Sequence, residues 1–198
     1  MTNVGHMWGS QGPPPEAYGR VTDAQRYREL HTVAHSLLND LQQRFDVTRE
    51  LSTESDRHSP EPAPVVRLVP ADPAASALTI VFDAFPGVLV RMGHDGGTHQ
   101  PVCGCDACDE PVEHCAEQLR GYVEVCVTGA FGERLVHDDT WWHERWYEFP
   151  TGVSWDRAPL DVPQRDALRE AFAGDEMRWA PWPQRRRRPV EKSVGARP

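Results

Sequence analysis

Three cysteines lie within six residues of one another, at Cys103, Cys105 and Cys108. In a reducing compartment, thiols clustered in this way indicate a metal site before a disulfide. Thiolates bind Zn²⁺ at about 2.3 Å, so the sulfur atoms of one site must lie within about 4 Å of one another. A short loop that contains Gly104 can bring three thiols around one ion. The spacing therefore predicts a zinc site at these cysteines.

A fourth ligand is expected close to the same loop. His99 lies four residues before Cys103 and is the most accessible imidazole, whereas His94 is farther away. Cys115 follows Cys108 by seven residues, and in a helix the two would be about 10 Å apart along the axis, too far to share one ion. Cys115 also continues an apolar helical stripe, so we expect it in the core. The predicted ligands are Cys103, Cys105, Cys108 and His99.

Two other interpretations of the cysteine loop stay open. The thiols could be small buried side chains that bind no metal. Alternatively, a CxxC at Cys105 and Cys108 before a helix is typical of thiol oxidoreductases, and three ligands with an open position are typical of a catalytic zinc ion. Five acidic side chains between residues 106 and 117 disfavour nearby thiolates, and a divalent cation would reverse that effect.

The motifs of several enzyme classes do not occur in the sequence. No His-x-Glu precedes Cys105, as a zinc deaminase requires, and HExxH, GxxxxGK[ST], GxGxxG and GxSxG are also missing. No catalytic residue is therefore assigned, and the thiol cluster favours a binding role over catalysis.

One long helix is expected well before the cysteine loop, and a second helix is expected directly after it. A capping-box pattern at residues 22–25 precedes apolar residues spaced three and four apart as far as Phe45, which predicts a long helix. Residues 52–64 are charged and rich in Ser and Pro, which indicates a loop. A second helix is expected over residues 112–126, with acidic residues at its N-terminal end.

Short runs of β-branched and aromatic residues between those helices predict strands at residues 65–69, 78–82 and 87–91. The last two runs are separated by Pro86, and we expect them to form an antiparallel hairpin.

The second half of the chain is rich in tryptophan: six of the seven tryptophans of the chain lie from Trp141 to Trp182. Residues 141–149 alternate between aromatic and charged side chains and are expected to form a hairpin with residues 153–155. A short third helix should follow, ending near Gly174. Because Pro181 prevents a helix, residues 179–182 should be extended and should pack on strand 141–149 within the same molecule.

These elements predict an α+β fold: a single domain with a mainly antiparallel sheet, packed by the long N-terminal helix and by the helix after the cysteine loop. We expect a flexible lead at residues 1–20, the domain at residues 21–183 and a disordered basic tail at residues 184–198.

The net charge of −9 is distributed unevenly along the chain. Residues 184–198 carry a charge of +5, so the other 183 residues carry −14. Such an acidic body repels phosphate backbones, which excludes nucleic acid as a partner apart from the basic tail. No apolar run approaches the roughly 20 residues that span a bilayer, and no signal peptide is recognisable. We expect a cytoplasmic protein without a membrane partner.

Four short motifs carry a resemblance to a known family: YGRVT at residues 18–22, FPGV at 85–88, PVCGCDACDE at 101–110 and WAPWP at 179–183. Together they resemble an actinobacterial family of small proteins known only as a domain of unknown function. The resemblance covers residues 18–186 and implies no activity, so it assigns no site residue. The family pattern has no cysteine at the position of Cys115, in agreement with a core role for that residue.

The sequence thus predicts a binding or interaction module whose cysteine loop holds a structural zinc ion. No catalytic residue is assigned to it. The alternatives are a thiol oxidoreductase or zinc-dependent enzyme that uses the same loop, and a domain whose buried thiols bind no metal. A protein is the expected partner.

Overall fold

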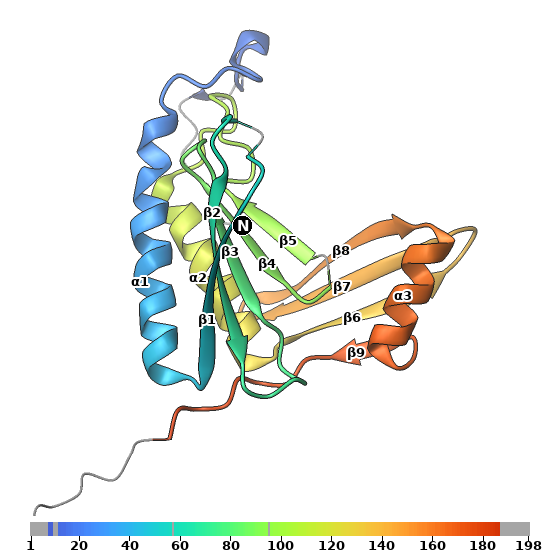
Figure 1. Cartoon of the computed structure of the whole chain (residues 1–198). Helices are drawn as coiled ribbons and strands as arrows, with labels where there is room; N and C mark the ends of the chain where they lie inside the picture. Colours follow the sequence, from blue (N-terminus) through green and yellow to red (C-terminus); the bar gives the residue numbers. More distant parts are fainter. Residues whose placement is uncertain (1–7, 10–11, 57, 95, 187–198) are drawn as a thin grey trace, which may run out of the picture.

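Figure 1 shows the computed structural model of the chain, which describes residues 8–9, 12–56, 58–94 and 96–186. Within these ranges the chain forms three α-helices and two antiparallel sheets of five and four strands. The predicted α+β class is confirmed, although the strands form two sheets and not one. No helix in the described ranges is long and apolar enough to cross a membrane.

The first sheet has its five strands in chain order: β1 (Val47–Glu54), β2 (Ala63–Pro70), β3 (Leu78–Phe82), β4 (Val88–Met92) and β5 (Gly96–Gln100). Helices α1 (Glu29–Arg44) and α2 (Val112–Thr128) cover one face of this sheet (Figure 1). The core between the helices and the sheet includes Leu38, Leu119 and Ile80, each with no exposed surface. Burial of such side chains contributes about 2 kcal/mol each.

The second sheet has the strand order β8-β7-β6-β9, formed by β6 (Phe131–His137), β7 (Trp141–Phe149), β8 (Gly152–Leu160) and β9 (Glu176–Arg178). Helix α3 (Val162–Phe172) packs on one face through Leu168 and Phe172, which contact the cluster around Leu135. The hairpins predicted at residues 78–91 and 141–155 are both present as β3–β4 and β7–β8.

The start of α1 differs from the predicted one. Residues Ala24–Arg28 form a 3₁₀-helix, and α1 begins only at Glu29. The hydroxyl of Thr22 does not cap the helix, because it donates a hydrogen bond of 2.6 Å to a carboxylate oxygen of Asp106. The contact with the cysteine loop therefore replaces the capping box that the local sequence predicts.

The lead expected at residues 1–20 is in part packed against the molecule. Among its described residues, Pro15–Ala17 form a 3₁₀-helix and Ala17 has no exposed surface. At the other end, Gln184 of the expected tail forms a bridge with Phe45. Residues 1–7, 10–11 and 187–198 lie outside the described residues.

The segment after β9 passes from the second sheet to the first. The amide of Ala180 donates to the carbonyl of Ala74, and the amide of Trp182 donates to that of Val127 at the end of α2, both at 2.9 Å. Trp182 is 3% exposed, packs edge-to-face on Phe45 and donates from its indole Nε1 to the carbonyl of Ser76 at 2.8 Å. This segment closes the core of the first sheet.

The intramolecular packing of this segment agrees with its prediction, but the predicted surface is wrong. Trp179 stacks on Phe131 of β6 and contacts His94, and Trp182 contacts Phe45; their aromatic contacts lie outside the predicted strand at residues 141–149. The reason is the pairing of β9 with β6, which brings Trp179 beside Phe131.

We expect Trp182→Ala to lower the free energy of unfolding by about 3–5 kcal/mol, because it removes a buried ring and an indole hydrogen bond. Denaturant unfolding followed by circular dichroism measures this change. The matched control is Trp155→Ala, at a ring that is 55% exposed, for which a loss of about 1 kcal/mol or less is expected. Equal losses for the two variants would contradict the role assigned to Trp182.

Candidate metal centre

The three predicted cysteine ligands meet in the loop between the end of β5 and the start of α2. The Sγ atoms of Cys103, Cys105 and Cys108 all lie within 4.8 Å of one another. The closest pair is Cys103 and Cys105, with 3.2 Å between the two sulfurs. Cys105 is buried, whereas Cys103 is exposed and Cys108 is half-buried. The cluster is thus open to solvent on the side of Cys103.

The backbone of the loop forms a tight turn around Cys105. The amides of Cys108 and Asp109 both donate to the carbonyl of Cys105, at 3.2 and 3.1 Å. Gly104 has a φ of 74°, and a Cβ atom there would lie 2.7 Å from the ring of Phe85. Glycine is therefore required between the first two cysteines, both by the backbone conformation and by the neighbouring ring.

The N-terminal segment packs directly against this turn. The amide of Asp106 donates to the carbonyl of Arg20 at 2.8 Å, and the amide of Ala107 donates to the carbonyl of Ala17 at 3.1 Å. The carboxylate of Asp106 in turn accepts from Arg20 and from both the amide and the hydroxyl of Thr22. A metal in this loop would therefore stabilise the junction between the N-terminal segment and the rest of the domain.

Glu110 fixes the other side of the loop. Its two carboxylate oxygens accept hydrogen bonds from the amides of Val102 and Cys103, at 3.0 and 2.8 Å. Its backbone carbonyl accepts from the phenol of Tyr27 at 3.1 Å. These roles of Asp106 and Glu110 are absent from the sequence prediction, in which both residues count only as negative charge.

The pKa values of the thiols differ because their hydrogen bonds differ. The amide of Cys108 and the thiol of Cys103 donate to Cys105 and lower its pKa to about 7, despite burial. The neighbouring thiols of Cys103 and Cys105, together with burial, raise the pKa of Cys108 to about 12. The cluster thus favours one thiolate, at Cys105, and disfavours a second. A divalent cation bound to the sulfurs would remove the cost of ionising the second thiol.

The predicted effect of the acidic residues on Cys105 is not observed. Asp106 and Asp109 are paired with Arg20 and Arg26, at 2.8 and 2.9 Å. Their charges are thereby compensated, and the local hydrogen bonds to Cys105 dominate its pKa.

His99 lies on β5, apart from the group of three sulfurs that fall within 4.8 Å of one another. Its Nδ1 is 3.6 Å from a carboxylate oxygen of Asp83, and its ring lines the same cavity, of about 380 Å³, as Cys103. His94 lies in the turn before β5, where its amide donates to Glu133. Cys115 has no exposed surface and packs with Tyr27, as predicted for a core residue.

The comparisons with known proteins give one match. The model of a family described as a family of unknown function, DUF6226, matches residues 2–186. No curated protein and no solved structure matches the chain.

We expect the N-terminal segment to leave the cysteine loop as the pH falls. Hydrogen bonds from Thr22 and Arg20 lower the pKa of Asp106 from 3.8 to about 2. Because the pKa is lower in the folded state, this stabilisation is complete above about pH 4 and is lost as the pH falls through about 2. The protection factors of the Asp106 and Ala107 amides, which are exchange rates corrected for the intrinsic dependence on pH, should fall steeply over that range.

Asp106→Asn is the control for this transition, because an amide has no carboxyl group to titrate. In that variant the protection factors of the same amides should not change between pH 4 and pH 2. An equal pH dependence in both chains would contradict the role of Asp106.

Proposed function

The chain belongs to the family of unknown function DUF6226, and we propose that it is a non-enzymatic binding module whose cysteine loop holds a structural zinc ion. The observation that carries this proposal is the convergence of three sulfur atoms to within 4.8 Å of one another. In a tetrahedral zinc site with Zn–S bonds of about 2.3 Å, the sulfurs lie about 3.8 Å apart. The 3.2 Å between the sulfurs of Cys103 and Cys105 and the limit of 4.8 Å for all three lie on either side of that value.

The chemistry of the donors supports zinc over other ions. Thiolates are soft ligands that favour zinc, copper(I) and iron–sulfur clusters, whereas carboxylates favour magnesium and calcium. The acidic side chains of the loop, Asp106, Asp109 and Glu110, already accept hydrogen bonds from arginine, threonine or backbone amide groups. The ligands left for a metal are therefore the three sulfurs.

The position of the loop supports a structural role. Its turn binds the N-terminal segment through Ala17, Arg20 and Thr22, and it leads directly into α2. All five cysteines of the chain are free thiols, so no disulfide links this junction. A zinc ion would supply the cross-link that holds it closed. A reducing cytoplasm, which we propose as the location, keeps the three thiols available for metal.

We propose His99 as the fourth ligand. Asp83 lies 3.6 Å from its Nδ1, and a carboxylate beside one ring nitrogen is the usual arrangement around a histidine that binds zinc through the other. The exposed ring of His99 and the exposed Cys103 line one cavity.

The binding role is supported by the outer face of the second sheet. Trp155 is 55% exposed and lies beside Trp146, and the guanidinium groups of Arg134 and Arg157 stack over Trp155 and Trp142. Tryptophan and arginine are the residues that most often carry the energy of protein interfaces. We therefore propose a protein as the partner.

An enzymatic use of the same loop is the second candidate. The low pKa of Cys105, about 7, favours a reactive thiolate. The cavity beside Cys103 also contains His58 and Asp83, so a zinc ion with an open position would face a space that admits a small molecule. This candidate predicts either a reversible disulfide or a zinc-bound water.

We expect the full chain, purified without added metal, to carry one zinc ion in native mass spectrometry. Removal of the ion by a chelator should expose the three cluster thiols to titration. Cys105→Ser should lose the ion, whereas Cys115→Ala, which changes a buried thiol outside the cluster, should keep it. A folded wild-type chain without metal would contradict the zinc proposal, and a mass lower by two hydrogens would favour the oxidoreductase.

We expect His99→Ala to weaken zinc binding by at least about tenfold in competition with a chromogenic chelator. The control is His58→Ala, because His58 lines the same cavity but is not a proposed ligand. An unchanged affinity in His99→Ala would assign the fourth position to water and favour the catalytic alternative.

A further inference from the structure

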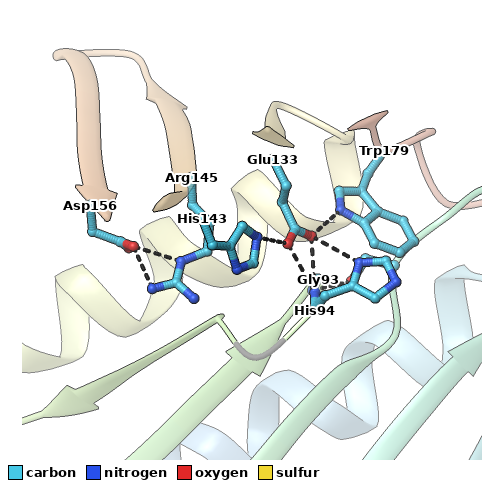
Figure 2. A network of polar contacts seen from close by, with 8 residues as sticks. Gly93, His94, Glu133, His143, Arg145, Asp156 and Trp179 are labelled. Carbon is cyan, nitrogen blue, oxygen red and sulfur yellow. Dashed lines mark hydrogen bonds and ion pairs between the residues drawn. The ribbon is translucent and has the colours of Figure 1, made fainter. Parts of the chain in front are cut away.

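A buried carboxylate lies far from the cysteine loop, at Glu133 in the centre of β6. Its side chain has no exposed surface and accepts hydrogen bonds from the imidazole Nε2 of His143, the indole Nε1 of Trp179 and the backbone amide of His94, at 2.7, 2.7 and 2.9 Å (Figure 2). Burial alone would raise the pKa of Glu133, but these hydrogen bonds lower it to about 2. The group is therefore a permanent anion whose charge is compensated by its partners.

The backbone is shaped to allow this arrangement. In the β6–β7 ladder, Leu135 pairs with His143 and Glu133 pairs with Arg145, so His143 is the diagonal neighbour of Glu133 on the same face. Gly93 has a φ of 66°, and a Cβ atom there would collide with the carboxylate of Glu133. Glycine at this position lets the turn before β5 reach the carboxylate with the amide of His94.

The ring of His143 contacts Glu133 through Nε2, and its other nitrogen, Nδ1, faces away from that carboxylate. The side chain is only 2% exposed and is held by its contact with Glu133. It lines a cavity of about 570 Å³ between α3, the hairpin β7–β8 and the turn before β5. A buried, oriented imidazole in the wall of a cavity of this size is typical of a ligand-binding site.

The lining of the cavity is basic in an acidic chain. Three basic side chains line it, those of His94, His143 and Arg145, and the described part of the lining contains no acidic side chain. Arg145 is oriented by Asp156, and His143 is oriented by Glu133 (Figure 2). Neither of these two acids is among the residues that line the cavity.

The remaining walls are apolar. They are formed by Pro159 and Leu160 of β8 and by Ala167, Leu168 and Ala171 of α3, with the amide of Gln164 at one edge. Apolar walls with a few convergent polar groups are typical of sites for small organic molecules.

We propose that this cavity binds a small organic carboxylate, whose anionic group contacts His143 and Arg145 and whose hydrocarbon part contacts the apolar side chains of β8 and α3. A carboxylate fits because the planar guanidinium group of Arg145 matches its two oxygens, and because a histidine ring that carries a proton on each nitrogen can donate one to Glu133 and the other to the ligand. The site shares no residue with the cysteine cluster and does not depend on a metal.

Benzoate, which combines a carboxylate with an apolar ring, is a suitable probe for the full-length chain. We expect saturable binding by ligand-observed NMR and calorimetry, and at least about tenfold weaker binding of benzamide, which has the same shape without the charge. Arg145→Gln should weaken benzoate to a similar extent. Equal binding of benzamide, equal binding of inorganic phosphate, or no benzoate binding at millimolar concentration would overturn the proposal.

A second variant separates loss of the site from loss of the fold. Ala167 is an exposed residue of α3 that lines the cavity, so Ala167→Phe should fill the space without removing a charge or a hydrogen bond. Its control is Glu170→Phe, which places the same ring on α3 outside the cavity. Benzoate binding should be lost only in Ala167→Phe, with both thermal unfolding curves close to wild type, whereas retention of wild-type affinity in Ala167→Phe would overturn the site.

Discussion

The buried carboxylate of Glu133 is the constraint that holds the two sheets in their relative positions. An ionised group without contact with water must receive hydrogen bonds from every direction, and Glu133 receives them from three separate parts of the chain. His143 comes from β7, His94 from the turn before β5, and Trp179 from the segment after β9. The second sheet, the first sheet and the C-terminal segment must therefore all be in place before this charge is satisfied.

The two ends of the chain complete features that lie far from them in sequence. The N-terminal segment packs on the cysteine loop through Asp106, with partners more than 80 residues apart. The C-terminal segment fills the core of the first sheet with Trp182. Each of these described segments contributes to a region in which a ligand is proposed: the N-terminal segment to the metal loop, and the C-terminal segment, through Trp179 and Glu133, to the basic cavity.

The sequence was sufficient where periodicity or spacing is strong. Helix α2, the strand β7 and the turn after it follow directly from apolar stripes and aromatic alternation, and the cysteine cluster follows from spacing alone. Strand β1 was missed because it is largely exposed and reads as polar, and β5 was missed because it begins with two glycines. The burial of Glu133 could have been predicted, because in a strand it shares one face with the apolar residues Phe131 and Leu135. Its partners could not be predicted, because they depend on the packing of two sheets.

The C-terminal segment has a consequence for the order in which the protein is made. Residues 180–185 donate or accept hydrogen bonds at Ala74, Val127, Asp46 and Arg44, and they are the last part of the described chain to leave the ribosome. Until they emerge, the core around Phe45 lacks the ring of Trp182 and the first sheet stays open at that edge. The first 170 residues contain both long helices and all five strands of that sheet, but they lack the ring that completes its core. A prematurely ended chain would therefore expose apolar surface to chaperones and proteases.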